Sequence, residues 1–132
     1  MNIGAAARAS GVSAKMIRHY EEGGLIPKVG RTAAGYRVYA DDDVHVLRFV
    51  RRARDLGFTI REIKALLALW KDHRRMSGDV KRLVTRHVGD LDTRIAEMQA
   101  MRRTLLDLAQ HCHGDRRPGC PILEDLAGKA RP

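Results

Sequence analysis

The chain has 132 residues, of which 44% are hydrophobic and only 5% are aromatic, and its formal charge is +9. The length fits one compact domain or a small domain with an extension, and the aliphatic composition favours helices over an aromatic-rich β-sandwich. The positive charge favours a polyanionic partner, nucleic acid before an anionic membrane, with basic residues that serve only solubility as the alternative.

The sequence predicts neither a membrane span nor a secretion signal. The longest apolar run, residues 65–70, is far shorter than the roughly 20 residues that cross a bilayer. Met1 leads directly into a short amphipathic segment that lacks the apolar core of a signal peptide. We therefore expect a cytoplasmic protein, in which thiols are kept reduced and a structural disulfide between the two cysteines is not the default.

Two short helices are predicted at the start of the chain. Residues 3–9 favour the first helix, and Ser10–Gly11 break it. Ser13 is a suitable N-cap for a second helix over residues 14–22, which the glycine pair at 23–24 ends. Two short helices joined by a tight, glycine-containing turn are a candidate helix-turn-helix.

A small antiparallel wing is predicted next. Residues 25–39 contain a proline and glycines that exclude a long helix, whereas their two tyrosines and Val38 favour strand. Ala34–Gly35 can form the turn between two short strands.

Two further helices are predicted after the wing. The three aspartates at 41–43 suit the positively charged start of a helix that ends at Gly57. Thr59 caps the following helix, and Glu62 completes a capping box. One stripe along that helix is apolar and consists of Ile60, Ile63, Leu66, Leu67 and Trp70.

A polar linker over residues 71–78 precedes a long predicted helix over residues 79–110. Four apolar residues repeat along it at intervals of seven: Val84, Leu91, Met98 and Leu105. This pattern predicts a coiled coil. The helix is about 48 Å long at 1.5 Å per residue, too long to bury the seam within so small a monomer. An antiparallel homodimer is the simplest way to bury it, and a helix folded back on its own domain is the alternative.

Basic and aromatic side chains cluster on the predicted helix-turn-helix and wing. They are Lys15, Arg18, His19 and Tyr20 on the second helix, and Arg31, Tyr36 and Arg37 on the wing. Lys15 and Arg18 share one face of the N-terminal half of that helix, the part of a recognition helix that enters the major groove. A cation beside a tyrosine hydroxyl is a common phosphate contact. Each residue alone would be a solvated side chain, but the set predicts binding of double-stranded DNA.

The segments HYEEGGLI, GYRVY and LGFTIREIKALL follow one another at the intervals found in the MerR family of transcription regulators, which the chain resembles over nearly its whole length. The resemblance implies a homodimer that binds a palindromic promoter with an over-long spacer. It further implies that the effector-bound dimer distorts the DNA so that RNA polymerase engages both promoter elements. The DNA-contacting positions of the family are matched by Lys15, Arg18, Tyr20, Tyr36 and Arg37. His19 departs from the family, since many relatives carry Tyr or Phe there.

Both cysteines lie in one turn-rich segment, HCHGDRRPGCPIL, at residues 111–123. Its glycines and prolines let the backbone bend so that Cys112 and Cys120 can face each other. Thiolates are soft ligands, and two opposed thiolates without further donors suit a singly charged d¹⁰ ion: Cu(I), Ag(I) or Au(I). The ion leaves one net negative charge, which the N-terminus of a short helix that begins at Pro121 stabilises. The same helix N-terminus should lower the thiol pKa values.

The loop also resembles that of the copper-efflux regulators within the MerR family, which keep two cysteines separated by seven residues and followed by Pro-Ile. In divalent-sensing relatives a third cysteine begins the dimerisation helix, and the resemblance places Ser77 at that position. It also implies that Lys81 from the other subunit offsets the residual negative charge of the site. The alternatives are that Ser77 only caps the helix and that Lys81 is only a solvated lysine.

Other interpretations of the cysteine loop stay open. Cys112 and Cys120 could cycle between dithiol and disulfide as a redox sensor, or form a zinc clip with His111 and His113. His113 alone could add a third ligand. An enzymatic Cys–His pair has little support, because adjacent residues rarely align as nucleophile and base and no third orienting group is evident.

The sequence therefore predicts a mainly α, non-enzymatic transcription activator of metal-efflux or detoxification genes, with Cu(I), Ag(I) or Au(I) as its effector. Its expected partners are promoter DNA, RNA polymerase and a second copy of the chain. The expected division is a winged helix-turn-helix DNA-binding domain, a linker, a long antiparallel coiled-coil dimerisation helix, and a metal-binding loop with a short C-terminal helix, at residues 1–70, 71–78, 79–110 and 111–132.

Overall fold

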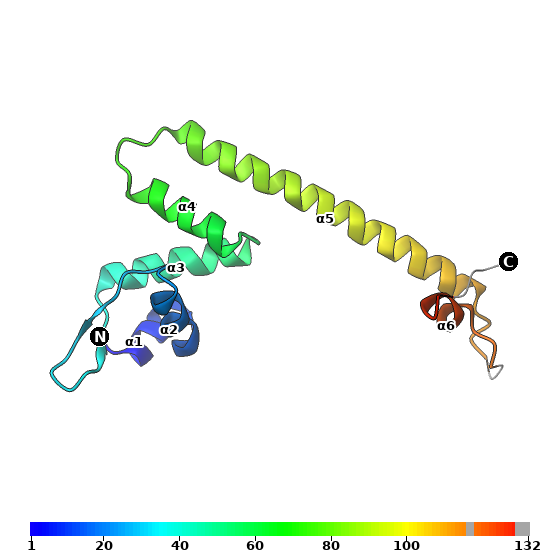
Figure 1. The fold of residues 1–132 in the computed structure, drawn as a ribbon, viewed down its shortest axis with the longest axis horizontal. Helices are drawn as coiled ribbons and strands as arrows, with labels where there is room; N and C mark the ends of the chain where they lie inside the picture. The colour runs from blue at the N-terminus through cyan, green and yellow to red at the C-terminus, as the bar shows by residue number, and fades with distance from the viewer. Residues whose placement is uncertain (116–117, 129–132) are drawn as a thin grey trace. The chain divides into compact units, whose positions relative to one another are not determined.

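The computed structural model of the chain describes residues 1–115 and 118–128. These residues belong to two units, Met1–Leu83 and Val84–Pro132, and the boundary between the units falls within the longest helix. The elements in chain order are α1 (Ile3–Ser10), α2 (Ala14–Glu22), β1 (Gly30–Arg31), β2 (Arg37–Val38), α3 (Asp41–Asp55), α4 (Ile60–Lys71), α5 (Ser77–His111) and α6 (Pro121–Leu126) (Figure 1). The predicted mainly α fold class is confirmed.

Helices α1 and α2 form the predicted helix-turn-helix, and short-range capping sets their ends. The Asn2 side chain accepts a hydrogen bond from the backbone N–H of Ala5 at 2.8 Å. The Ser13 hydroxyl accepts one from the N–H of Met16 at 3.2 Å. Between the helices, Gly11 ends α1 with φ of 77°, a left-handed conformation that glycine adopts without steric cost.

Strands β1 and β2 form the predicted wing. They pair antiparallel, with Gly30 opposite Val38 and Arg31 opposite Arg37. The N–H of Thr32 donates to the carbonyl oxygen of Tyr36 at 2.8 Å and closes the loop between the strands.

Helices α3 and α4 begin where their caps predict. Asp43 accepts a hydrogen bond from the N–H of Ala40 at 2.8 Å at the start of α3. A capping box starts α4. The N–H of Thr59 donates to the Glu62 carboxylate at 2.9 Å, and the N–H of Glu62 donates to the Thr59 hydroxyl at 3.2 Å. Each half satisfies a backbone N–H that the first turn of a helix would otherwise leave without a partner.

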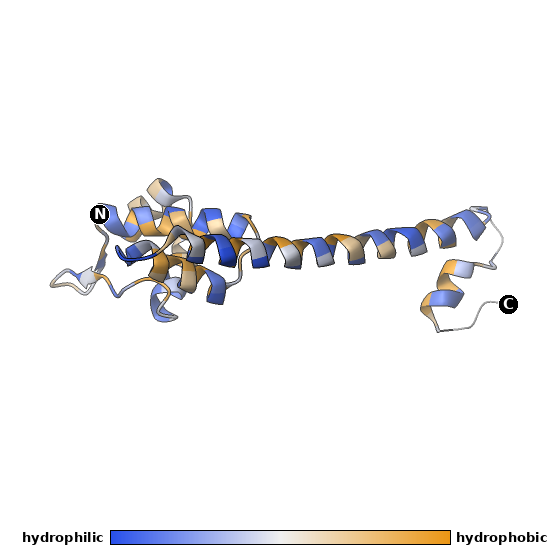
Figure 2. Ribbon diagram, turned by 90° about the horizontal axis from the view of Figure 1, so that it is seen from above, coloured by the Kyte–Doolittle hydropathy of each residue, from blue (hydrophilic) through white to orange (hydrophobic). Residues whose placement is uncertain are grey.

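The hydrophobic core of the first unit lies between these four helices. All four helices contribute fully buried side chains, as does Tyr39 after β2. The larger helical ones include Ile17, Leu47, Val50 and Ile63. Figure 2 shows apolar residues gathered between the helices of this unit. The rings of Phe49 and Trp70 stack at 4.7 Å and join α3 to the end of α4.

Helix α5 contains 35 residues, which corresponds to a length of about 52 Å. It begins two residues before the predicted start at 79, so the last two residues of the predicted linker are helical. In the second unit, apolar residues recur along α5 (Figure 2) and most of them are exposed, as at Val88, Ile95, Met98, Met101 and Leu105. Within residues 1–115 and 118–128, none of the helices combines the length and the apolar character that a membrane span requires.

Candidate DNA-binding surface and candidate metal centre

The exposed face of α2 carries three of the four side chains that the sequence assigns to DNA contact there. Lys15, Arg18 and His19 are exposed, and Lys15 and Arg18 share a face because they lie three residues apart. Tyr20 is only 6% exposed and belongs to the core. Its carbonyl oxygen accepts a hydrogen bond from the N–H of Leu25 at 2.9 Å, so this residue also holds the turn that follows α2.

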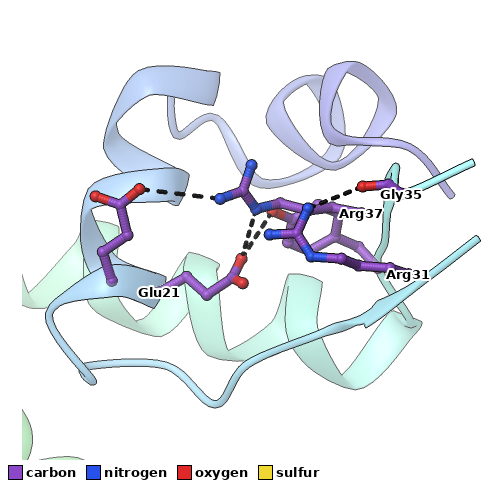
Figure 3. Close-up of polar contacts among 6 residues, drawn as sticks. Glu21, Arg31, Gly35 and Arg37 are labelled. Atoms are coloured by element: carbon purple, nitrogen blue, oxygen red, sulfur yellow. Dashed lines mark hydrogen bonds and ion pairs between the residues drawn. The ribbon is translucent and has the colours of Figure 1, made fainter.

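The tip of the wing presents Tyr36, which is 73% exposed. In the same loop, Nη1 of Arg31 donates a hydrogen bond to the carbonyl oxygen of Gly35 at 2.8 Å (Figure 3). Gly35 has a φ of 87° and so allows the tight turn that brings its carbonyl oxygen to the guanidinium. The Arg31 contact therefore braces the loop from which Tyr36 projects.

Arg37 is held against α2 by the two glutamates that end this helix. Its Nε–H donates to Oε2 of Glu21 at 3.1 Å, and its Nη2 lies 3.9 Å from Oε1 of Glu22 (Figure 3). The Tyr39 hydroxyl donates to the same Oε2 of Glu21 at 3.3 Å. The wing and α2 are therefore joined through one carboxylate.

The Glu21 carboxylate is only 6% exposed, and this buried role was not identified from the sequence. A signal was present, because Glu21 lies four residues after the buried Ile17, at a position that the helical period assigns to the core. Burial raises the pKa of Tyr39, the nearby charge of Glu21 raises it further, and the charge of Arg37 opposes the rise. A carboxylate buried at this place is stable because two donors reach it.

Cys112 and Cys120 are brought together at the end of α5. Cys112 follows the last residue of α5, and Cys120 is the N-cap of α6. Their Sγ atoms lie 4.0 Å apart and both thiols are free. A disulfide would need about 2.05 Å. Metal–thiolate bonds of roughly 2.3 Å would place two sulfurs about 3.8 Å apart at a tetrahedral angle and about 4.6 Å apart in line. The observed spacing between the two thiols falls within that interval.

The first turn of α6 acts on the Cys120 sulfur. The backbone N–H of Leu123 donates to this sulfur and lowers the pKa of the Cys120 thiol. Partial burial opposes the shift, while the N–H of Ile122 and the Cys112 thiol add to it. Both N–H groups belong to the helix start, where no backbone carbonyl is available to accept them. The arrangement favours a thiolate at this position.

The two histidines beside the cysteines have different surroundings. The Nδ1 of His111 lies 2.7 Å from the carbonyl oxygen of Asp107 and 3.4 Å from its carboxylate, so this ring faces back along α5. His113 is exposed and lines a shallow depression together with Cys120 and Glu124. In the described parts of the chain, neither cysteine belongs to a group of three or more Cys, His, Asp or Glu ligand atoms within 4.8 Å of one another.

Ser77 and Lys81 lie in the first two turns of α5 and are exposed. Cys112 follows the opposite end of the same helix. A helix of this length separates its two ends by about 50 Å. Ser77 and Lys81 therefore do not contact the cysteines of their own chain.

Comparisons with known proteins agree with this architecture. Residues 1–69 match the family described as "MerR HTH family regulatory protein", and residues 44–108 match "MerR, DNA binding". The chain is 59% identical to the HTH-type transcriptional regulator HmrR of Sinorhizobium medicae (strain WSM419). It is also 59% identical to the heavy metal-dependent transcription regulator 2 of Rhizobium meliloti (strain 1021). Each match extends over 127 residues, which are 96% of this chain and 86% of the relative.

A solved structure with a similar fold is that of the transcription regulator PbrR691 from Ralstonia metallidurans CH34 in complex with lead(II). The two chains are 32% identical and superpose with a TM-score of 0.82. The match covers 96% of this chain and 98% of that one. The likeness therefore extends over nearly the whole chain.

Proposed function

The chain belongs to the MerR family of helix-turn-helix regulatory proteins, and from that premise we propose that it is a homodimeric transcription activator that senses Cu(I) through Cys112 and Cys120. In this proposal residues 1–70 bind promoter DNA, residues 71–78 link them to the dimerisation helix over 79–110, and residues 111–132 form the sensing loop and short helix.

The observation that carries the proposal is the pair of free thiols 4.0 Å apart, one of them at the start of α6. Sulfur donors select soft ions. Two thiolates and a singly charged ion together carry one net negative charge. The N–H groups of Ile122 and Leu123 stabilise that negative charge on the Cys120 side. When bound, the ion replaces the thiol protons and ties the end of α5 to the start of α6. Ag(I) and Au(I) would be held in the same way.

Two relatives support a metal effector. The Rhizobium meliloti relative is named as heavy metal-dependent, and PbrR691 was solved with lead(II). The lead(II) complex makes a divalent ion the second candidate effector. The two sulfurs favour the monovalent ion, because a divalent ion at two thiolates would be neutral and would lack further ligands.

On the DNA side, α2 enters the major groove with Lys15, Arg18 and His19, while Arg31, Tyr36 and Arg37 grip phosphates from the wing. Tyr20 supports this surface from the core. Distorting a 20–30 base-pair site costs on the order of 1–6 kcal/mol. The metal supplies this energy by binding better to the distorting state of the dimer, which then lets RNA polymerase engage the promoter.

Dimerisation completes the sensing site. Two α5 helices that pair antiparallel bury the exposed apolar seam, and each brings its start to the other subunit's cysteine loop. Ser77 then occupies a position that offers no thiolate, which keeps the site at two sulfurs. Lys81 offsets the residual negative charge of the bound ion.

The deciding experiment is X-ray absorption at the copper edge on anaerobic, Cu(I)-loaded protein, together with promoter transcription in vitro. We expect two sulfur scatterers, and we expect Cu(I) under a competing chelator to activate transcription. The Cys112→Ser/Cys120→Ser variant should bind the promoter but not respond. A nitrogen-rich shell would indicate the histidine clip, equal activation by Zn(II) or Pb(II) would indicate a divalent sensor, and activation by a thiol oxidant without metal would indicate a redox sensor.

A further inference from the structure

A hollow rich in arginine lies between the end of α1 and the C-terminal half of α3. Its lining includes Arg8, Gly11, Arg48, Arg51, Arg52 and Asp55. Four guanidinium groups thus face one carboxylate. Such a concentration of like charge is unfavourable unless an anion neutralises it.

Backbone groups at the end of α1 position two of these arginines. The Nε–H of Arg48 donates to the carbonyl oxygen of Ala9 at 3.0 Å, which satisfies one of the carbonyls that a helix end leaves without a partner. Arg51 lies over Gly11 so closely that a Cβ added there would be 1.9 Å from Nη1. Gly11 thus leaves space for the guanidinium as well as forming the turn.

The other three arginines of the hollow differ from Arg48 in their partners. Within residues 1–115 and 118–128, no ion pair or hydrogen bond engages the side chains of Arg8, Arg51 or Arg52. A guanidinium offers a rigid fork of N–H donors that matches the oxygens of a phosphate. The hollow therefore has the chemistry of a phosphate-binding site.

We propose that this hollow binds a phosphate of the promoter backbone beside the groove that α2 enters. The inference rests on the proposed DNA binding and adds a contact that neither α2 nor the wing provides. Gly11 lies two residues before Ser13, the N-cap of α2. The major groove is only about 12 Å wide, so a chain that leaves it at the N-terminus of a recognition helix passes directly over a sugar–phosphate strand. The hollow begins at that turn.

The test compares Arg51→Ala and Arg52→Ala with the unsubstituted protein in DNA-binding titrations over a range of salt concentrations. Each lost phosphate contact reduces the slope of log K against log salt by about 0.9, and a dimer loses two such contacts. We expect weaker binding to promoter and to unrelated DNA by the same factor, because a phosphate contact carries no sequence information. Arg51→Lys should retain most of the salt slope, since it retains the charge.

The matched control is Arg103→Ala, an equal change of charge on the exposed surface of α5, which should leave the salt slope unchanged. If the unsubstituted protein binds the promoter and both hollow variants bind it with the same affinity and salt slope, this inference is wrong while the proposed function stands. If the two variants bind DNA normally but activate transcription less, the inference is also wrong. The hollow would then bind an acidic protein surface instead of DNA. Failure of the unsubstituted protein to bind promoter DNA would overturn both proposals.

Discussion

At the scale of single residues, the wing depends on one buried carboxylate. Glu21 accepts from Arg37 and Tyr39, which lie 16 and 18 residues further along the chain. These contacts consume the Nε–H of Arg37 and fix the plane of its guanidinium. In the proposed complex Arg37 would meet DNA in an orientation that α2 determines, and we therefore propose that Glu21 is a positioning residue for the wing.

Replacing Glu21 tests this role. Glu21→Gln keeps the size of the side chain but removes its charge, and we expect the free energy of unfolding to fall by about 1.5–3 kcal/mol, the range for a hydrogen bond to a charged group. DNA affinity should fall further than in Glu22→Gln, because Glu22 is exposed and lies 3.9 Å from Arg37. Urea unfolding and DNA titration measure the two effects. Equal behaviour of the two variants would contradict the assignment.

The raised pKa of Tyr39 predicts a loss of stability at high pH. Because the folded state holds the Tyr39 proton more tightly than the unfolded state, this contribution is complete below the ordinary tyrosine pKa of about 10. It is lost as the pH rises from there through the folded value. The free energy of unfolding should be lower above pH 10 than at pH 8. This decrease should be smaller in Tyr39→Phe, because the variant lacks the hydroxyl that titrates. An unchanged pH profile in Tyr39→Phe would count against the burial of this hydroxyl.

The Cys120 thiol should be a thiolate at lower pH than an ordinary cysteine. Its rate of alkylation, measured against pH in the metal-free Cys112→Ser variant, should rise below the usual thiol range. Leu123→Pro removes the N–H that contributes most to the shift and should move the profile back up. Leu123→Ala is the control, since it removes the side chain and keeps the N–H. Identical profiles for the two Leu123 variants would show that the helix start does not act on the sulfur.

At the scale of elements, the turn between α1 and α2 depends on Gly11 in two ways. Its φ of 77° is unfavourable for other residues by about 1–2 kcal/mol, and an added Cβ would collide with Arg51. We expect Gly11→Ala to be destabilising, and Arg51→Ala to recover only the part due to the collision. A double-mutant cycle in urea measures that coupling. Simple additivity of the two substitutions would mean that Arg51 moves aside without cost.

At the scale of the whole molecule, the exposed apolar seam of α5 predicts a dimer. Met98 is 66% exposed in the single chain, so Met98→Glu should disrupt association and leave the winged helix-turn-helix folded. Gln99→Glu introduces the same charge at the next position, off the heptad repeat, and should stay dimeric. Sedimentation equilibrium gives the mass of each variant. A dimeric Met98→Glu protein would place the interface elsewhere.

The sequence by itself determined the secondary-structure elements and which two residues carry a thiol. Ser13, Thr59 and Glu62 mark helix starts by hydrogen bonds that reach no further than three residues, and the heptad repeat indicates the long helix. Capping and periodicity are local effects, so they can be recognised from neighbouring residues. The two cysteines that we propose as ligands were equally visible, because the chain has no others.

Only the tertiary structure decided which side chains share an environment. It buries Tyr20 and Glu21, sets the two sulfurs 4.0 Å apart, and gathers arginines from α1 and α3 around Gly11. These arrangements join residues 8 to about 40 positions apart along the chain. They arise because packing one helix against another fixes side-chain distances that no local pattern contains.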